Sequence, residues 1–510
     1  MVLDISETKQ DIVELSVSAW FYRNRAIAGF DNPARSLYVS VRELLENSLD
    51  ASEEVGVLPE IRVSLSYVGK QDDSTGIPST PRIFKLTVSD NGGGIESDDI
   101  PKLIGKMLTG TKFVLKQSRG TFGLGGSLAL LYGQITTQKP ITVESAIKGN
   151  PYRNVLTMKL DIEKNEPVIL GSRKLPKRSE EHGTTVSYFL QGDWFRSKRR
   201  IQEYFNQTSL IVPYASIEFD TPDGEILSYP RIIDVLPDAA TEMKPHPKGI
   251  DVEMLKSMIA STKSKNIETF LINSFQRVGP ATADSFLKFA GVESNMPPED
   301  LNDDDLVNLM ERISAFEDFY APSADCLSPA QADVMRAGMK RLHPEYVSLA
   351  TRNPNSYEGH PFIIETGIAY GGQLQRSLEL YRFANRIPLL YDESADVSSR
   401  VLRELNLSHY GLSNDDPLAF FIHICSTKIP YKTVGKEYIA DVDIVRREIE
   451  LGFKDCLRSI ATKVRNKNRV RKRKKRENKL ALYYGFIANT LSDSLGREIQ
   501  PKLGLSKEVY

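Results

Sequence analysis

Two short segments near the N-terminus, residues 61–68 and 83–89, alternate apolar and polar residues as half-buried β-strands do. Between them, residues 71–81 are rich in Asp, Ser, Thr, Gly and Pro, which predicts an exposed hairpin loop. Residues 96–122 follow neither the strand period nor the helix period, and they contain several glycines. We therefore expect this stretch to form a mobile lid rather than a regular element.

Helical spacing dominates the middle of the chain. Between residues 235 and 315, apolar residues fall at intervals that suit packed helices: Leu255, Met258, Ile259, Ile267, Phe270, Leu271, Phe275, Phe286, Leu287 and Phe289. A turn at residues 278–281 interrupts them. Pro280 is expected to begin a new helix there, because proline is favoured at the first helical position.

Strand-like and helical stretches alternate in the last third of the chain. Apolar runs at residues 362–368, 387–391 and 419–424 are separated by helical segments, which is an α/β layout. Such a layout ordinarily uses a right-handed crossover between parallel strands. From about Val442 the chain is strongly helical, and one apolar stripe follows the helical period: Ile449, Phe453, Cys456, Leu457, Ile460 and Val464.

Length and composition indicate the number of domains and the cellular compartment of the protein. At 510 residues the chain is long enough for roughly two to four domains with cores of their own. Its three cysteines have no CxxC spacing, which argues for a reducing compartment and against a disulfide framework or a structural zinc site. The sequence shows neither a secretory pattern nor an apolar run of membrane-spanning length. We expect an intracellular protein with no membrane partner.

The segment 42–51 carries the first candidate chemistry. Read as a helix, it places Glu43, Asn47 and Asp50 on one face, while three leucines can face the core. Asn47 can offer a neutral oxygen to Mg²⁺, and Glu43 can orient or deprotonate a water that attacks a phosphate. An ordinary amphipathic surface helix has the same spacing, and it is the alternative for this segment.

A glycine-rich turn follows the second predicted strand. From Asp90 the chain reads Asp-Asn-Gly-Gly-Gly-Ile, and three successive glycines favour a tight turn at which the backbone approaches a ligand closely. Asp90 can accept a hydrogen bond from an exocyclic amine, which favours adenine over guanine. The alternative is a simple Asn-Gly hairpin turn.

Residues 119–127 form a second glycine-rich segment, which leads into the apolar run 128–132. A glycine-rich loop before a helix presents backbone N–H groups and the positive end of a helix dipole to an anion. The segment is not a Walker A loop, because no Gly-Lys-Ser or Gly-Lys-Thr follows the glycines.

Taken in this order, the three motifs resemble the ATP-binding fold shared by gyrase, Hsp90, histidine kinases and MutL, the GHKL or Bergerat ATPases. The flanking sequence resembles the B subunit of type IIB DNA topoisomerase (topoisomerase VI) from about residue 15 to beyond residue 440. The matching segments are residues 30–38, 41–44, 123–125, 129–132, 361–362, 367–372, 385–392 and 435–437.

This resemblance implies an α+β multidomain fold in four parts. Residues 1–30 would form an N-terminal strap that reaches across a dimer, with a local first helix as the alternative. Residues 31–234 would form the GHKL ATPase α/β sandwich. Residues 235–320 would form a helix-two-turns-helix domain that either contacts DNA or serves as a spacer. Residues 321–510 would form a transducer with a left-handed βαβ element of the ribosomal-protein S5 type and a long basic C-terminal helix.

The resemblance also implies the residues of the site. Glu43 would activate the hydrolytic water, Asn47 would ligate Mg²⁺ together with the phosphates of ATP, and Asp90 would read adenine. Lys436 of the transducer would contact the γ-phosphate, so that the orientation of the domains depends on that phosphate. The further nucleotide-binding positions are Gly92, Gly94, Lys112, Gly120, Thr121, Phe122, Gly123, Leu124, Gly125, Gly126 and Thr184. For Thr184, a β-branched residue that merely suits a strand is the alternative.

The implied function is that of the ATP-hydrolysing subunit of a topoisomerase. Two copies would dimerise on Mg·ATP and close a gate around one DNA duplex. A separate A subunit, in a heterotetramer of two A and two B subunits, would cut the other duplex. Eleven basic residues lie from Lys463 to Lys479 against the single acid Glu477, which favours sequence-independent phosphate contact. A solvated face or a nuclear-import signal is the alternative for this run.

Two other classes share the ATP-binding fold. A sensor histidine kinase would need a phosphoacceptor histidine ahead of the ATP site, but His182 is the first histidine of the chain. A non-topoisomerase ATP-dependent DNA clamp is the alternative function. Intact Glu43 and Lys436 argue against an inactive homologue, and the Gly-Phe-Arg-Gly-Glu-Ala lid of MutL proteins is absent. An archaeal cytoplasm, with the protein associated with the nucleoid, is expected rather than a eukaryotic nucleus.

Overall fold

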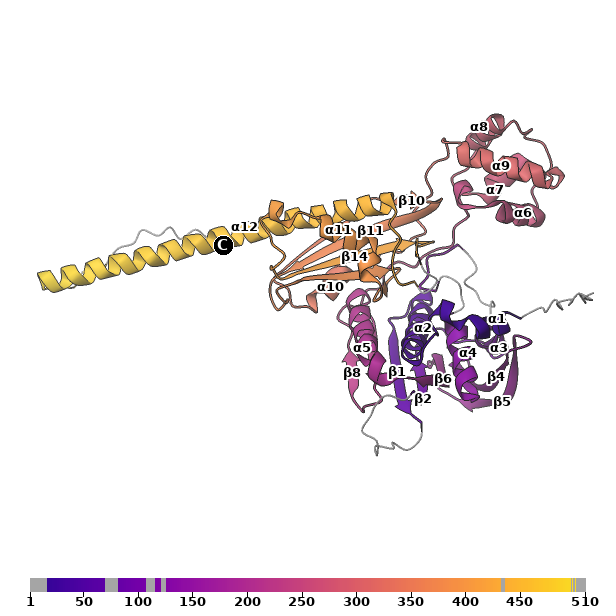
Figure 1. Cartoon of the computed structure of the whole chain (residues 1–510), viewed down its shortest axis with the longest axis horizontal. Coiled ribbons are helices and arrows are strands. Elements are labelled where there is room, and N and C mark those ends of the chain that lie inside the picture. Colours follow the sequence, from indigo (N-terminus) through magenta and orange to yellow (C-terminus); the bar gives the residue numbers. More distant parts are fainter. Residues whose placement is uncertain are drawn as a thin grey trace, which may run out of the picture.

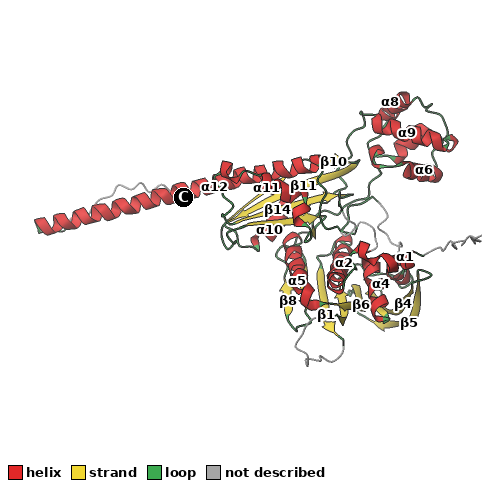
Figure 2. Cartoon of the chain, viewed as in Figure 1, coloured by secondary structure: helices red, strands yellow, loops and turns green. Residues whose placement is uncertain are grey.

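Two α/β domains, a helical domain between them in sequence, and a long terminal helix make up the described part of the molecule (Figure 1). The computed structural model describes residues 16–68, 81–106, 115–120, 125–432 and 436–496, together with 498 and 500. Among these residues, the strands are confined to the two α/β domains (Figure 2). The predicted α+β multidomain fold is confirmed.

In the described part of the chain, the N-terminal domain is built on an eight-stranded sheet of order β5-β4-β3-β6-β2-β1-β7-β8. Its strands are β1 (Glu60–Tyr67), β2 (Arg82–Ser89), β3 (Ile141–Ala146), β4 (Tyr152–Asp161), β5 (Glu166–Pro176), β6 (Gly183–Gly192), β7 (Ser216–Asp220) and β8 (Ile226–Tyr229). β1 and β7 are parallel, and the other neighbours are antiparallel. The two segments predicted to be strands from their alternation are β1 and β2, so that prediction is confirmed.

The helices of this domain pack against the sheet. They are α1 (Val17–Asn24), the 3-10 helix η1 (Arg25–Ala28), α2 (Pro33–Glu54), α3 (Ile100–Gly105), α4 (Gly125–Thr137) and α5 (Trp194–Ile211). α2 lies between α4 and α5 and packs on β1, β2 and β6. The expectation that residues 96–122 contain no regular element is wrong for α3, because Pro101 favours a first helical turn and Ile100 is buried.

Part of the predicted strap can be compared with the structure. Residues 1–15 lie outside the described residues. Residues 17–24 form α1, where Phe21 packs edge-on against Phe30 with ring centroids 5.8 Å apart. The Ser16 hydroxyl donates to the Ile162 carbonyl oxygen at 2.8 Å. Residues 17–24 therefore form a local helix, and a strap that reaches across a dimer stays a prediction.

The helical domain buries a core of its own. It contains α6 (Val252–Ser261), α7 (Ile267–Ser274), α8 (Pro280–Ala290) and α9 (Asp303–Ala315), with the 3-10 helices η3 (Pro247–Gly249) and η4 (Pro298–Asp300). Pro280 begins α8, as predicted. The predicted apolar positions are buried or partly buried, except Phe289, which is 45% exposed.

Over the described residues, the second α/β domain has a six-stranded sheet of order β10-β11-β14-β12-β13, with β9 beside β11. Its strands are β9 (Tyr346–Thr351), β10 (Asn355–Tyr357), β11 (His360–Tyr370), β12 (Leu378–Ala384), β13 (Ile387–Pro388) and β14 (Leu418–Ser426). Its helices are α10 (Ala332–Lys340), η5 (Glu393–Ala395), α11 (Val397–Glu404), η6 (Leu407–Tyr410) and α12 (Asp443–Leu495). β12 and β14 are parallel, and the other neighbours are antiparallel.

The strand predicted at residues 387–391 is shorter than expected. It ends at Pro388, which has no N–H to donate to the ladder. The predicted runs 362–368 and 419–424 lie inside β11 and β14, as expected.

Helix α12 has 53 residues and changes character along its length. Its N-terminal part packs on β9 and β11, and every residue of the predicted apolar stripe is buried there. Beyond Val464 its side chains are largely exposed, and the helix projects away from the domain (Figure 1). None of the described helices combines the length and the apolar character needed to cross a membrane.

Candidate functional site

Helix α2 carries the residues around which the candidate site is built. Asn32 caps it by accepting a hydrogen bond from the Arg35 N–H at 2.8 Å, and Pro33 occupies its first position. Most of the helix is buried, including Glu43, which is 7% exposed, and the three leucines predicted to face the core, whereas Asn47 is exposed. α2 is therefore a core helix, which excludes the alternative of an ordinary surface helix.

The N-terminus of α4 meets the polar face of α2. A β-carbon added to Gly125 would lie 1.6 Å from Glu43 Oε2, and one added to Gly126 would lie 2.6 Å from Asn47 Nδ2. Only glycine permits so close an approach. The first turn of α4 thus places its backbone N–H groups beside a carboxylate, which is paired with Arg42, and a carboxamide. This is the arrangement of an anion site at a helix N-terminus.

Asp90 lies at the end of β2, where three donors hold its carboxylate. Oδ1 accepts from the N–H groups of Gly92 at 2.9 Å and Thr184 at 3.1 Å, and Oδ2 accepts from the Ser48 hydroxyl at 3.1 Å. Burial raises the pKa of Asp90, and these hydrogen bonds act in the opposite direction. The carboxylate is fixed beside α2, and Thr184 belongs to the site through its backbone.

The turn after Asp90 is shaped by close contacts between backbones. Gly94 has φ +79°, and a β-carbon there would lie 2.1 Å from the Ala146 carbonyl oxygen. A β-carbon on Gly92 would lie 2.8 Å from the β-carbon of Ala51 in α2. β2 is followed by α3 and not by a partner strand, which excludes the alternative of a simple hairpin turn.

Two polar residues beside the motif positions were missed by the sequence analysis. Ser48 holds Asp90, as described above. The side-chain oxygen of Asn91 accepts from the Ser52 hydroxyl at 3.1 Å and from the Glu60 N–H at 2.9 Å. Their position in the sequence could have revealed these two residues, because each directly follows a predicted site residue. Both tie the turn to α2 or to β1.

Lys436 reaches the site from the second α/β domain. Its Nζ donates to the Arg119 carbonyl oxygen at 2.8 Å and lies 4.0 Å from Glu46 Oε2. The side chain is 8% exposed, and its backbone is left-handed, with φ +54°. The neighbouring Glu437 pairs with Arg35 at the start of α2. The segment therefore contacts α2 at its start and near its middle.

Glu46 is a third residue that the sequence analysis missed. It lies three positions after Glu43, is 2% exposed, and accepts a hydrogen bond from the Tyr204 hydroxyl at 2.8 Å. Burial and the neighbouring Glu43 raise the pKa of Glu46, while Lys436 and Arg42 oppose that shift. Two buried carboxylates thus share one face of α2, and Lys436 approaches the second of them.

Several predicted nucleotide contacts lie outside the described residues, namely Lys112, Thr121, Phe122, Gly123 and Leu124. Gly120 is described, and its carbonyl oxygen accepts a hydrogen bond from the Ser118 hydroxyl at 2.7 Å. The structure brings together the remaining predicted positions: Glu43, Asn47, Asp90, Gly92, Gly94, Gly125, Gly126, Thr184 and Lys436.

The donor set at Asn47 fits Mg²⁺ only together with a ligand. Among the described residues, no group of three or more His, Cys, Asp or Glu side chains could hold a metal by itself. Asn47 offers one neutral oxygen donor beside the α4 N-terminus. Mg²⁺ accepts such a site when phosphate oxygens and water complete its octahedron.

A cavity of 740 Å³ lies elsewhere, between the start of α2, α5 and the segment after β13. Its lining includes Arg35 and Arg200, which stack on Tyr391 with 5.4 Å and 3.8 Å to the ring centroid. None of the predicted site residues that the structure describes lines it. The candidate site is therefore defined by its residues and not by this cavity.

Comparisons with known proteins agree with this arrangement. Residues 32–191 match the family model "Histidine kinase-, DNA gyrase B-, and HSP90-like ATPase", and residues 322–476 match "Topoisomerase VI B subunit, transducer". The chain is 39% identical to the B subunit of type 2 DNA topoisomerase 6 from Metallosphaera sedula over 97% of the chain and 93% of that protein. It is also 39% identical to the B subunit of the same enzyme from Saccharolobus shibatae, over 94% of the chain and 89% of that protein.

Among solved structures, the chain is similar to the 43K ATPase domain of Thermus thermophilus gyrase B in complex with an aminocoumarin. The TM-score is 0.42 at 14% identity, over 90% of this chain and 97% of that one. Gyrase B of Myxococcus xanthus gives the same TM-score at 8% identity, over 87% and 95% of the two chains.

Proposed function

The chain belongs to the family of type 2 DNA topoisomerase 6 B subunits, and from this membership we propose how its residues drive such an enzyme. It is an ATP-driven topoisomerase subunit with a GHKL ATPase domain and a transducer. Two copies bind ATP, their N-terminal domains associate, and the closed dimer encircles one DNA duplex.

ATP lies between α2 and the N-terminus of α4. Asp90, oriented by its three hydrogen-bond donors, accepts a hydrogen bond from the adenine amine. The backbone N–H groups from Gly120 to Gly126, together with Lys112, hold the phosphates. Asn47 would hold Mg²⁺ through its side-chain oxygen, and the ion would neutralise phosphate charge when bound.

Glu43 is the general base of the hydrolytic reaction. Its Oε2 lies beside the first turn of α4, where the terminal phosphate would sit, so a water between them would lie within its reach. The pairing of Glu43 with Arg42 fixes the side chain without occupying the face toward α4. Glu43 then accepts the proton of the attacking water.

The position of Lys436 is the observation that carries the proposal. This residue belongs to the transducer, yet its ammonium lies on the polar face of α2 and against the segment that precedes the glycine-rich loop. An ammonium at this place binds a γ-phosphate and loses that partner after hydrolysis and phosphate release. The orientation of the transducer relative to the ATPase domain thereby depends on the nucleotide.

The partners of this protein meet α12. A separate A subunit completes a heterotetramer of two A and two B subunits, and the C-terminal part of α12 offers it exposed apolar side chains, among them Leu482 at 77% and Phe486 at 73%. The basic run from Lys463 to Lys479 is exposed and contacts the phosphates of the transported duplex. The relatives are archaeal, which favours an archaeal cytoplasm and association with the nucleoid.

The solution mass of the full chain tests this cycle. The Glu43→Ala variant is measured by light scattering after size exclusion, without nucleotide and with Mg·ATP. We expect a monomer that becomes a stable dimer with Mg·ATP, because the variant binds ATP without hydrolysing it. The matched control is Glu54→Ala, which removes an exposed carboxylate from the same helix. It should dimerise only transiently, as we expect of the wild type.

A mass that ATP leaves unchanged, while calorimetry shows that ATP binds, would contradict the proposed gate. ATP affinity lost in Glu43→Ala but kept in Glu54→Ala would instead contradict the assignment of Glu43 as a residue of the chemical step.

A further inference from the structure

The two-residue turn between β12 and β13 has an unusual sequence for its shape. Asn385 and Arg386 both have positive φ, +47° and +64°, and Ala384 pairs with Ile387 on either side of them. A turn of this type favours Asn followed by Gly, because the second position is left-handed as well. Arginine there is strained, and such strain persists where a side chain has a task.

The sheet of the transducer holds this turn in place. The Asn385 N–H donates to the Ile424 carbonyl oxygen at 2.8 Å, and the Arg386 N–H donates to His423 Nε2 at 3.0 Å. The Asn385 side chain exchanges two hydrogen bonds with the backbone of Ser426, both 3.0 Å long. All three of these partners belong to β14, a strand inside the sheet, so the turn moves with the transducer.

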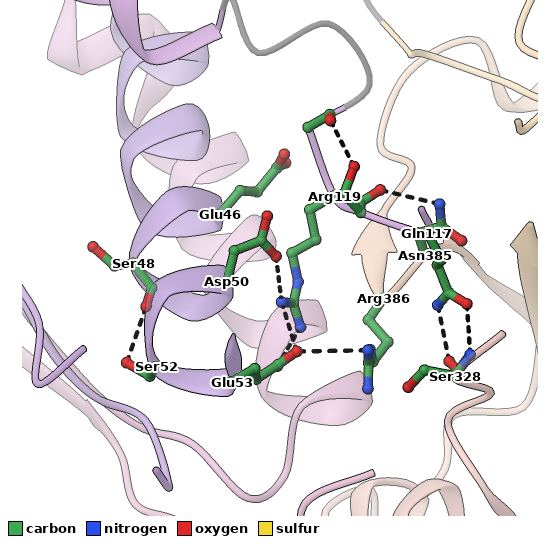
Figure 3. A network of polar contacts seen from close by, with 12 residues as sticks. Glu46, Ser48, Asp50, Ser52, Glu53, Gln117, Arg119, Ser328, Asn385 and Arg386 are labelled. Carbon is green, nitrogen blue, oxygen red and sulfur yellow. Dashed lines mark hydrogen bonds and ion pairs between the residues drawn. The ribbon is translucent and has the colours of Figure 1, made fainter. Parts of the chain in front are cut away.

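Both side chains of the turn point into the ATPase domain (Figure 3). An Arg386 guanidinium nitrogen lies 3.5 Å from Glu53 Oε2 in α2, and Asn385 Nδ2 donates to the Ser118 carbonyl oxygen at 3.1 Å. Glu53 also pairs with Arg119 at 2.6 Å. The turn therefore contacts α2 and the residues just before the glycine-rich loop at the same time.

The charges at this junction balance. Asp50 and Glu53 of α2 face Arg119 and Arg386. Besides its pairing with Glu53, Arg119 lies 2.8 Å from the Asp50 carboxylate. Both arginines are less than a tenth exposed. Burial acts to raise the pKa of Glu53, but the guanidiniums of Arg119 and Arg386 hold this pKa below its ordinary value. The four groups form a buried network that joins the two domains.

The segment 115–120 is held along its length from outside the N-terminal domain. The Leu115 carbonyl oxygen accepts from the Met243 N–H at 3.0 Å. Gln117 exchanges two 2.8 Å hydrogen bonds with the backbone of Ser328. Asn385 then holds Ser118, and Gly120, the first glycine of the loop, comes two residues later.

We propose that the Asn385-Arg386 turn of the transducer is a positioning element for the phosphate-binding loop, acting through contacts other than the one that Lys436 makes with the Arg119 carbonyl oxygen. Arg386 holds Arg119 through Glu53, and Asn385 holds the backbone one residue earlier. Together they fix the base of the loop in the place that a triphosphate needs. This inference rests on the proposed function, because it takes residues 120–126 as the loop that holds phosphates.

The Arg386→Gly variant tests it. Glycine suits the left-handed turn, and Glu53 keeps Arg119 and the Tyr214 hydroxyl, 2.6 Å away, as partners, so the fold should survive. The matched control is Glu358→Gly, which removes an exposed side chain with φ +48° from the two-residue turn between β10 and β11 of the same sheet. Both variants relieve the same kind of strain, but only one touches the network.

The first readout uses a non-hydrolysable ATP analogue and the full chain. In Arg386→Gly, the analogue concentration that gives half-maximal dimerisation should rise roughly tenfold, as expected for a contact that couples two sites. In Glu358→Gly it should match the wild type. An unchanged concentration in Arg386→Gly would overturn the inference. Arg386→Lys, which keeps the charge but not the guanidinium fork, should fall between the two.

The second readout needs no nucleotide. Hydrogen exchange at the N–H groups of Met243 and Ser328, which donate to Leu115 and Gln117, should be faster in Arg386→Gly than in Glu358→Gly. Equal exchange in the two variants would overturn the inference even if ATP drives dimerisation. If exchange is faster in Arg386→Gly but the wild type does not dimerise with ATP, the positioning of residues 115–120 by the turn would be upheld and the proposed function would be rejected.

The double variant Arg386→Gly with Lys436→Ala tests whether the turn and Lys436 act independently. If they act independently, the fold-changes that the two single variants cause in the half-maximal analogue concentration multiply in the double variant. A double variant whose half-maximal analogue concentration does not exceed that of the more impaired single variant would show that both residues act through one route, and it would refute their independence.

Discussion

The ammonium of Lys436 lies 4.0 Å from Glu46 Oε2, although the two residues belong to different domains. Glu46 is buried and also held by the Tyr204 hydroxyl, so this carboxylate stays in place when Lys436 moves. A terminal phosphate at the N-terminus of α4 would compete with Glu46 for the ammonium. In the proposed function the ammonium thus has two possible anionic partners, Glu46 and the phosphate, and the nucleotide decides between them, which is the differential contact that a domain movement requires.

Removal of the Lys436 ammonium should uncouple nucleotide binding from DNA transport. In Lys436→Ala we expect ATP still to bind, since Asp90 and the glycine-rich loop are intact, while relaxation of supercoiled DNA by the enzyme reconstituted with its A subunit is lost. Lys432→Ala is the control, because this lysine lies in the same loop and is exposed. Relaxation at the wild-type rate in Lys436→Ala would remove this residue from the mechanism.

Loss of the Glu43 carboxylate should separate binding from hydrolysis. We expect kcat of Glu43→Ala to fall by roughly 10²- to 10⁴-fold, the usual contribution of a general base, with the Kd for ATP little changed. Steady-state phosphate release and calorimetry give the two quantities. The exposed Glu54→Ala on the same helix should keep wild-type kcat. Turnover near the wild-type rate in Glu43→Ala would show that another group activates the water.

Local patterns predicted much of the site because its residues lie close together in sequence or follow a simple period. Glu43 and Asn47 are one helical turn apart, and Asp90 ends a strand whose alternation is plain in the sequence. The apolar stripe of α12 was predicted for the same reason, and all its members are buried. Such features depend on helix and strand geometry alone.

The network around Glu53 could not be predicted in this way. Arg119 and Arg386 are charged residues in loops, and a loop arginine is normally exposed. Their burial depends on partners far away in sequence, the carboxylates of Asp50 and Glu53 in α2. Glu46 lies on the same helical face as Glu43, but the pattern does not reveal that Lys436 and Tyr204 enclose it. Pairings between distant segments decide these positions.

The contact between Gly125 and Glu43 predicts a sharp effect of a single methyl group. In Gly125→Ala the new β-carbon would lie 1.6 Å from Glu43 Oε2, so the carboxylate has to move. We expect kcat to fall by about 10²-fold, the scale of an ångström-sized misplacement of a catalytic group. Phosphate release measures it, and circular dichroism checks that the fold is retained.

The control for this variant is Gly485→Ala in α12, where an added β-carbon meets no atom within 4 Å. Alanine there should stabilise the helix by about 0.5–1 kcal/mol and leave kcat unchanged. A full wild-type kcat in Gly125→Ala would mean that Glu43 tolerates displacement, and it would argue against its role as the base.

The basic run of α12 should dominate the salt dependence of DNA binding. The variant replaces four exposed cations by glutamine: Arg471, Lys472, Lys474 and Lys475. Each phosphate contact that is lost should reduce the slope of log K against log salt by about 0.9. Fluorescence anisotropy with a duplex at several salt concentrations measures the slope, and affinity should fall equally for unrelated DNA sequences.

The control for the basic run neutralises four exposed cations of the N-terminal domain: Lys148, Lys164, Arg173 and Lys174. Both variants change the net charge by the same amount, so a general effect of charge would alter both slopes alike. A slope that changes equally in the two variants would contradict direct contact of α12 with the duplex.

Glu53 should stabilise the protein in a pH-dependent way. Arg119 and Arg386 hold its folded-state pKa below the ordinary value of 4.5, against the opposing effect of burial. A carboxylate with a lowered pKa contributes stability that is complete above the unfolded-state pKa and is lost as the pH falls through the folded-state pKa. The difference in Tm between the wild type and Glu53→Gln should therefore be largest near pH 7 and shrink below about pH 4.5, where the protonated acid resembles glutamine.

Melting curves of both proteins from pH 7 to pH 3.5 give this difference. Asp90 and Glu46 have raised pKa values, so their proton uptake favours the folded state as the pH falls, which is the opposite sign. Both residues are present in wild type and variant, and their contributions cancel in the difference. Glu54→Gln, which changes an exposed side chain, should show no pH-dependent difference. A gap that widens towards acid in Glu53→Gln would mean that the arginines do not stabilise the ionised form of Glu53.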